Sequence, residues 1–450
     1  MVNRLSDTFP SPPRPDERVL QGAHSFFWKA ARLGLLAVLV SAPLAFGAVE
    51  YWARAALLVA ALALMLLWSF AVARDKILSI YWTPLYLVGA IFLLLGITQF
   101  SGHLTIDAFA TREALLGFVT PLVYFFLAGQ MMAQTGGRNL SRFALIVLIY
   151  ASALSLFAII QLFSGSGLIY WTVKPRWGGS VMGPYVNRND YAGLMEMLVP
   201  LGVAYVLSRP KGYPAKTLLG FAALLSLTSL LLSGSRGGLV SLLVEAVVLV
   251  GVVVKSVPGV HRRHLVATIG IGIIAVDLLF FWLAPTYITR HLKSTVAVVS
   301  SPEVSMGDRL KVSEDALRIF LDHPWLGTGL GTFEEAFPQY QSFPSDLEWD
   351  HAHNDFAEAL SETGLAGGIL IAIALFLGLR TAFGSLSSRL TTEEGWIQLG
   401  ATIGCCGLLV HSFVDFNLHI PANALWFSVA LAIATFRREP QKLPSPIPST

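Results

Sequence analysis

Charged residues are scarce in this sequence, and cysteine is nearly absent. Asp, Glu, Lys and Arg make up 13% of the 450 residues, whereas a water-soluble chain carries roughly a quarter. An ordinary soluble protein is therefore excluded. The two cysteines, Cys405 and Cys406, are adjacent in an apolar run, so a disulfide framework is excluded as well. The net charge of +3 says little, because in a membrane protein the placement of charge carries the information.

What the sequence has instead is a series of long apolar runs. Hydrophobic residues make up 54% of the chain, and the mean hydropathy is +0.64. Runs of about 17 to 23 apolar residues match a hydrocarbon core of roughly 30 Å. They predict an all-α polytopic membrane protein with about twelve transmembrane helices, near residues 33–49, 52–73, 83–100, 114–133, 142–164, 190–208, 216–233, 237–255, 264–284, 364–383, 395–413 and 421–436.

Lys and Arg gather in every second predicted loop and in both tails. This distribution predicts that both termini are cytoplasmic and that the alternate loops lie on the other face, which for a bacterial inner membrane is the periplasmic face. The chain then divides into a disordered cytoplasmic tail (1–30), spans one to nine (31–284), a large periplasmic loop with amphipathic helices and histidines (285–363), spans ten to twelve (364–436) and a second cytoplasmic tail (437–450).

Two arginines stand out because they fall on the predicted outer face. Arg236 lies in LLLSGSRGGLVSLL, a tight hairpin between the seventh and eighth spans. Its glycines let the backbone and the fork-shaped guanidinium approach one anion; the alternative is an anchor that reaches lipid headgroups. Arg309 lies in a short amphipathic helix expected on the membrane surface, where a salt bridge to Asp308 or Glu314 is the alternative. The apolar face of that helix comprises Leu310, Leu317, Phe320 and Leu321.

The stretch DHAHNDFAEALSETGLAGG places histidines and carboxylates directly before an apolar span. A helix that starts near His351 would stack His351 over Asp355 and Asn354 over Glu358. His353 would then be free to take a proton from a hydroxyl, as a general base does. Two alternatives stay open at this point. Asp350, His351 and His353 could bind a metal if a further ligand is found, or the histidines could simply be polar residues at a hydrated helix end.

A second polar group, HSFVDFNLHIPANA, follows the eleventh span. His411, Asp415 and His419 are four residues apart, so in a helix they would share one face. They would either support the site or merely reflect the polarity of the interface. Pro421 is expected to begin the last span, since proline is tolerated in a first turn. Three carboxylates within predicted spans, those of Glu196, Glu245 and Asp277, have no partner assigned from sequence and would also suit a transporter.

Several of these motifs, in this order, resemble the O-antigen ligase and polymerase family of bacterial envelope glycosyltransferases. They are GPYVNRNDYAGLMEML, SGSRGG, GDRLKVSEDALRIFLDHPWLGTGLGTF and HNDFAEALSETGLAG. The last contains the family's pattern of His-Asn followed by two glycines, here His353, Asn354, Gly364 and Gly367. The resemblance covers about residues 180 to 435, and the first five spans only by topology.

The resemblance implies a glycan donor on undecaprenyl diphosphate and an acceptor that is lipid A-core or a growing polysaccharide. Arg236 and Arg309 would bind the diphosphate, and His353 would deprotonate the acceptor in an inverting transfer without metal or cofactor. Contacts to substrate are expected from Asn354, Asn187, Asn189, Arg188, Arg176, His351 and Glu362, with His411 and Asp415 behind them. The expected partners are this donor, the acceptor and membrane lipids, and no nucleic acid is expected. The alternatives are a repeat-unit polymerase of the same family, a flippase for lipid-linked anionic glycans and a metal-dependent membrane hydrolase.

Overall fold

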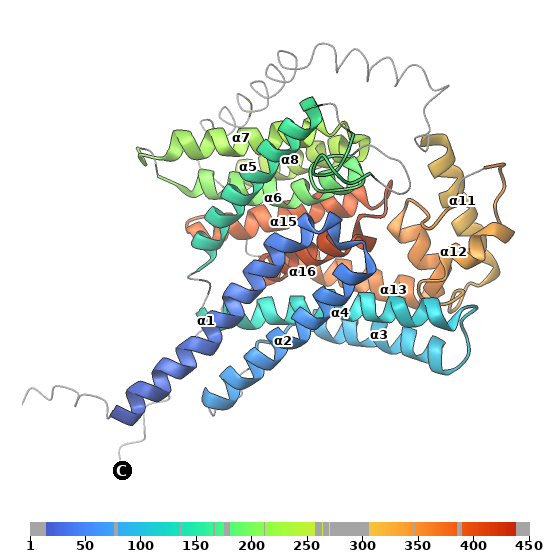
Figure 1. The fold of residues 1–450 in the computed structure, drawn as a ribbon, viewed down its shortest axis with the longest axis horizontal. Coiled ribbons are helices and arrows are strands. Elements are labelled where there is room, and N and C mark those ends of the chain that lie inside the picture. Colours follow the sequence, from blue (N-terminus) through green and yellow to red (C-terminus); the bar gives the residue numbers. More distant parts are fainter. Residues whose placement is uncertain are drawn as a thin grey trace, which may run out of the picture.

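A computed structural model describes most of the chain. The described residues are 15–75, 80–135, 137, 139–164, 167–174, 181–210, 212–256, 263, 270, 306–345, 348–384 and 389–437. All regular elements among them are helices (Figure 1), which confirms the predicted all-α class. Apart from residue 270, the predicted ninth span (264–284) lies outside the described residues, and so do Arg176 and Asp277.

Eight of the described helices are long and apolar enough to cross a membrane. They are α1 (Pro15–Leu44, apolar from Phe26), α2 (Tyr51–Asp75), α3 (Pro84–Ser101), α4 (Ala108–Thr135), α5 (Leu140–Ser164), α6 (Arg188–Ser208), α8 (Arg236–Ser256) and α13 (Asp355–Phe383). Two apolar helices are shorter, α7 (Lys216–Leu232) and α16 (Pro421–Thr435). With α15 (Glu393–His411), a helix covers every predicted span except the ninth. A multi-pass membrane protein is thus supported, while the number twelve stays a prediction.

Polar residues at the helix starts explain several of these bounds. Thr83 caps α3 by accepting a hydrogen bond from the backbone N–H of Leu85, and Thr392 caps α15 in the same way through Gly395. Such caps satisfy N–H groups that have no partner within the helix. Helix α16 begins at Pro421, as predicted.

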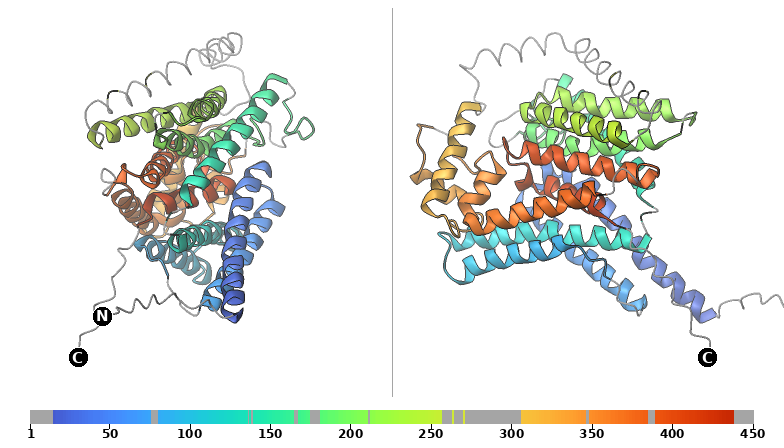
Figure 2. Two further views of the ribbon diagram at one scale, coloured as in Figure 1. Left: turned by 90° about the vertical axis from the view of Figure 1, so that its left-hand side faces the viewer. Right: turned by 180° about the vertical axis from the view of Figure 1, so that it is seen from behind.

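Helices α6 and α15 form the centre of the bundle and pack closely along their length (Figures 1 and 2). Glycines on α15 make this approach possible. A Cβ atom on Gly400 would lie 2.6 Å from the carbonyl oxygen of Pro200, and one on Gly404 would lie 2.9 Å from Cα of Met197. Small residues at helix interfaces are how membrane helices approach closely. The close packing fixes where the residues that follow α15 emerge.

A small helical layer covers one end of the bundle (Figures 1 and 2). It comprises α11 (Met306–Asp322), α12 (Phe333–Ala336) and the 3-10 turn η2 (Phe337–Gln339), which pack on the first turns of α13. Its core contains Val312, Ala316, Ile319, Phe333, Phe337, Trp349 and Ala352. The other side of α11 exposes Leu310, Leu317 and Leu321, so α11 is amphipathic as predicted and presents an apolar face away from the bundle.

The opposite end of the bundle carries basic residues. Arg209 pairs with Glu393 at the start of α15, Arg437 donates to the carbonyl of Gly384 after α13, and Arg32 donates to Gln134 near the end of α4. Helices α13 and α15 therefore run from one end of the molecule to the other. The end of α15 and the start of α13 meet on the side away from these arginines.

Candidate active site

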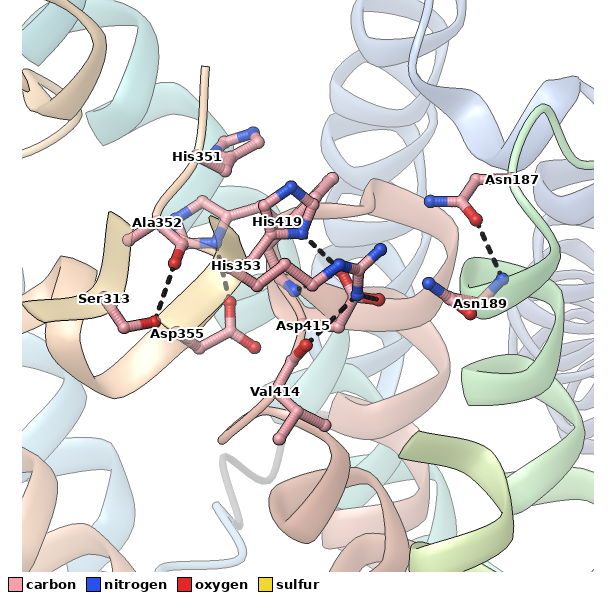
Figure 3. Close-up of polar contacts among 12 residues, drawn as sticks. Asn187, Asn189, Ser313, His351, Ala352, His353, Asp355, Val414, Asp415 and His419 are labelled. Carbon is pink, nitrogen blue, oxygen red and sulfur yellow. Dashed lines mark hydrogen bonds and ion pairs between the residues drawn. The ribbon is translucent and has the colours of Figure 1, made fainter. Parts of the chain in front are cut away.

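His353, Asp415 and Arg309 form a chain of polar contacts beneath the helical layer. Nδ1 of His353 lies 3.2 Å from Oδ1 of Asp415, and Nη1 of Arg309 donates to Oδ2 of the same carboxylate at 2.9 Å. The same Nη1 atom also donates to the carbonyl oxygen of Val414 at 3.3 Å. Figure 3 shows His353 and Asp415 facing each other from the loop before α13 and the turn after α15. The predicted salt bridges of Arg309 to Asp308 or Glu314 are replaced by this longer-range pair.

The environment of Asp415 keeps it ionised. Only 1% of its side chain is exposed, and burial alone raises the pKa of a carboxyl group. Arg309 and His353 outweigh burial and hold the pKa of Asp415 well below its usual range. A carboxylate at this distance favours the tautomer of neutral His353 that carries its proton on Nδ1. The other ring nitrogen, Nε2, is then an acceptor. The His353 side chain is 10% exposed, and its Nε2 has no hydrogen bond among the described residues.

The loop that carries His353 is held in an unusual conformation. His353 has φ +48°, a left-handed value that is uncommon for residues other than glycine. Ala352, its neighbour, is fixed on both sides: Oγ of Ser313 donates to its carbonyl oxygen at 3.1 Å, and its N–H donates to Glu358 at 2.7 Å. The loop is thus tied both to α11 and to α13, which presents the imidazole toward Asp415.

The prediction of a helix from His351 was wrong by four residues. Helix α13 begins at Asp355, because the side chain of Asn354 accepts hydrogen bonds from the N–H groups of Phe356 and Ala357 at 3.1 Å each. His351 consequently lies in the loop and does not stack over Asp355. It contacts Glu358 instead, through Nδ1 and Oε1 at 2.7 Å.

His351 belongs to a second polar cluster, two residues from His353. Oε1 of Glu358 also lies 3.3 Å from Nε2 of His419, and Nδ1 of His419 lies 2.8 Å from Oδ1 of Asp355. Burial by itself lowers the pKa of a histidine, but Glu358 and Asp355 raise the pKa of His419 to about 10, and Glu358 raises that of His351. The ring of Phe416 contacts the rings of His351 and His353, with centroids 4.5 and 4.9 Å away.

His411, Asp415 and His419 do not share a helical face, which corrects the prediction for HSFVDFNLHIP. Helix α15 ends at His411, a turn follows, and residues 417–419 form the 3-10 turn η3. Asp415 therefore faces His353, and His419 faces Asp355. His411 points into the bundle, where its Nδ1 lies 2.8 Å from Oε1 of Glu196. This pair supplies the partner that could not be assigned to Glu196 from sequence.

Arg236 begins α8 near the same turn. The two glycines after it pack directly against neighbours: a Cβ on Gly237 would overlap the ring of His411, and its distance to Cγ2 of Val414 would be 3.0 Å. Val414 is the residue whose carbonyl oxygen binds Arg309. Arg236 itself is exposed and makes no hydrogen bond or ion pair within the described part of the chain. Arg309 thus contacts the Val414 turn from α11, and Gly237, the residue after Arg236, packs against it from α8.

With this arrangement established, comparison with known families is informative. Residues 221–372 match the sequence model of the O-antigen ligase family. This segment of the chain is therefore similar to O-antigen ligases. The match covers about a third of the 450 residues and includes Arg236, Arg309 and His353, so it confirms the resemblance derived from the motifs. No curated protein matches the sequence.

Part of the candidate site lies beyond the matched O-antigen ligase segment. Asp415, His411 and His419 follow residue 372 and are brought to the domain by the packing of α15. The sequence identified these residues as polar but did not predict which carboxylate each histidine meets. Phe416, and Trp349 with its ring 5.8 Å from His353, were missed altogether, since nothing in their sequence context separates them from lipid-facing aromatics.

The other residues predicted to contact substrate lie within or near the matched segment 221–372. Asn187 caps α6 through a hydrogen bond from the N–H of Asn189, and Figure 3 shows both asparagines across from the His353 loop. Arg188 is the first residue of α6 and half-buried. Glu362 is 3% exposed and accepts a hydrogen bond from the N–H of Phe333, so it anchors α12. Their roles toward substrate stay predictions.

Proposed function

We propose that this chain is an inner-membrane glycosyltransferase of the O-antigen ligase type. It transfers a glycan from undecaprenyl diphosphate to a hydroxyl group of lipid A-core or of a growing polysaccharide. The observation that carries the proposal is the contact of His353 with Asp415, which leaves Nε2 of the imidazole without a partner among the described residues. Histidine oriented by a carboxylate is a recurrent arrangement for a general base.

The proposed reaction is a single displacement at the anomeric carbon. The acceptor oxygen attacks from the face opposite the diphosphate, and its proton passes to Nε2 of His353. The bond between the anomeric carbon and the phosphate oxygen breaks, its electron pair leaves with the diphosphate, and the configuration inverts. Asp415 stabilises the imidazolium that forms, because it is an ionised carboxylate 3.2 Å away.

The two arginines would stabilise the leaving diphosphate. Arg236 has its whole guanidinium available, since it is exposed and unpaired within the described residues. Among the described residues, Arg309 makes hydrogen bonds through Nη1 alone, to Asp415 and Val414, so its other N–H groups can reach a phosphate oxygen. Preorganised donors aimed at developing charge contribute up to a few kcal/mol each. No step of this displacement requires a metal.

The proposed side of the membrane follows from charge. The contacts of Arg32, Arg209 and Arg437 lie at one end of the bundle and the His353 site lies toward the other. Basic residues favour the cytoplasmic side, so we place both termini in the cytoplasm and the site at the periplasmic surface. A lipid-linked donor would then enter from the outer leaflet of the inner membrane.

A ligase and a repeat-unit polymerase share these parts and differ only in the acceptor. A flippase, the alternative outside the family, needs cationic groups for its cargo but has no use for a base. The oriented imidazole therefore favours transfer over transport.

The decisive experiment uses the purified chain, a polyprenyl diphosphate glycan and two acceptors, lipid A-core and a second carrier-linked repeat. We expect transfer by the wild type, near-complete loss in His353→Ala, and wild-type rates in the control His323→Ala, which changes an exposed histidine. The acceptor that is glycosylated distinguishes ligase from polymerase. Transfer by His353→Ala at the wild-type rate would exclude His353 as the base.

A further inference from the structure

The side chains of His351, Glu358 and His419 form a cluster that takes no part in the proposed transfer. One ligand atom from each side chain lies within 4.8 Å of the other two. Oε1 of Glu358 lies 2.7 Å from Nδ1 of His351 and 3.3 Å from Nε2 of His419. For tetrahedral zinc, ligand atoms are about 3.4 Å apart given metal–ligand bonds of about 2.1 Å. The distance of 3.3 Å is close to this value, whereas 2.7 Å is a hydrogen-bond distance, so the side chains of His351 and Glu358 would have to move slightly apart to bind the ion.

The outer atoms of two of these side chains are held by separate partners. Nδ1 of His419 lies 2.8 Å from Oδ1 of Asp355, whose Oδ2 accepts the N–H of Leu418 at 3.2 Å. The second oxygen of Glu358 accepts the N–H of Ala352 at 2.7 Å. A histidine that ligates a metal through one nitrogen commonly donates the other to a carboxylate, which fixes the ring. His419 has this arrangement, with Nε2 turned to the centre of the cluster.

The buried carboxylates of the cluster are a further feature that a cation would suit. Glu358 and Asp355 are 1% and 6% exposed, and two buried carboxylates side by side need compensation. A divalent ion at the centre of the cluster would supply this compensation. The competing explanation is that the contacts of His351 and His419 with Glu358 and Asp355 balance the two carboxylates without an ion.

We infer that His351, Glu358 and His419 bind a single divalent transition-metal ion, with Zn²⁺ the best fit to two imidazoles and one carboxylate. A fourth position is left for water. Entry from solvent is open, because the side chains of His351 and His419 are 23% and 34% exposed. This group differs from the one considered from sequence, since His353 is turned to Asp415 and Asp350 is exposed.

The ion would join two segments that are far apart in sequence. His351 belongs to the loop that presents His353, and His419 to the turn η3 that follows Asp415. A metal between them would hold the His353–Asp415 contact in place. This role rests on the proposed function, whereas metal binding itself does not.

The test uses the full-length chain, purified without a histidine tag and stripped with EDTA. Calorimetric titration with Zn²⁺ should give one tight site per chain. Co²⁺ in the same site should give the visible absorption of a four-coordinate ion. Neither measurement depends on a variant.

Variants then assign the ligands. We expect His419→Gln and Glu358→Gln to lower Zn²⁺ affinity at least 100-fold, Asp355→Asn to lower it about 10- to 100-fold, and the control His323→Ala to bind like the wild type. Stripped wild type that takes up less than a tenth of an equivalent of Zn²⁺, or equal uptake by His419→Gln, would overturn the inference. Tight binding without sugar transfer would leave the metal site standing and refute only the proposed function.

Discussion

Two histidine–carboxylate pairs flank the turn after α15, and they differ in surroundings rather than in chemistry. Nδ1 of His353 contacts Asp415 at 3.2 Å, and Nδ1 of His411 contacts Glu196 at 2.8 Å. The side chain of His353 is 10% exposed, that of His411 only 1%. An arginine joins the first pair, and a glycine backbone packs against the second. Both partners are carboxylates, so the surroundings distinguish the two histidines: the exposed fraction of His353 agrees with the proton transfer that we propose, and the burial of His411 suits it for holding helices together.

The strongest test of this contrast changes each histidine to alanine. His353→Ala should lower the transfer rate by about 10² to 10⁴, the usual contribution of a general base, with little change in melting temperature. His411→Ala should instead cost about 3–5 kcal/mol of stability, because Glu196 loses the partner of a buried pair. Rates and melting curves of the two variants, measured together, would contradict the assignment if the effects were exchanged.

Substitution of Arg236 should lower the transfer rate nearly as much as substitution of His353. We expect Arg236→Ala to lower the transfer rate about 100-fold, from the loss of a few kcal/mol of leaving-group stabilisation. Arg236→Lys should recover little, since a point charge does not replace the planar fork. Arg112, an exposed arginine that pairs with neighbouring Glu113 and lies over the ring of Phe109, gives a matched control. Full activity of Arg236→Lys would favour a simple headgroup anchor.

Asp415→Asn should also lower the transfer rate, but by less than His353→Ala, because the imidazole remains and is no longer oriented by a charge. The KM for the donor should change less than kcat. If Asp415→Asn behaved like wild type in steady-state kinetics, the carboxylate would have no part in transfer.

Gly237→Ala probes the packing between α8 and α15. An added Cβ overlaps the ring of His411, so we expect a loss of about 1–3 kcal/mol in stability. Gly251→Ala on the same helix is the control, since nothing lies within 4 Å of its Cβ position. Equal melting temperatures of the two variants would contradict this packing.

The smallest effect concerns pH. The pKa of Asp415 is lower in the folded protein than its ordinary value of about 3.9. Its pairing therefore stabilises the fold above about pH 4, and this contribution is lost as the pH falls toward the folded-state pKa. Melting temperatures of wild type and Asp415→Asn should converge on acidification, and a constant difference would exclude this linkage.

The sequence predicted much of the fold because apolar run length and helix caps are local properties. Helices cover eleven of the twelve predicted runs, and α16 begins at Pro421 as expected. The start of α13 was missed although its signal was present. Asn354 before Asp355 and Glu358 is a typical N-terminal pattern, and Asn354 is the residue that caps the helix.

Which histidine contacts which carboxylate could not be predicted in the same way. A helical reading of HSFVDFNLHIP set His411, Asp415 and His419 on one face, but α15 ends at His411 and the following turns send the three side chains to different partners. Such a turn depends on what packs against it. A Cβ on Gly193 of α6 would overlap Asn417, so the backbone of α6 fixes the position of η3.

The sequence by itself determined that this chain is a helical membrane protein, where its helices lie, and which histidines and arginines are available for chemistry near residues 236, 309 and 353. The tertiary structure decided which carboxylate each histidine meets. His353 and Asp415 are 62 residues apart and His411 and Glu196 are 215 apart. No local periodicity relates residues at such separations. The close packing of α6 against α15 brings His411 to Glu196, and the contact of the start of α13 with the turn after α15, through the N–H of Asp355 and the carbonyl oxygen of Ser412, brings His353 to Asp415.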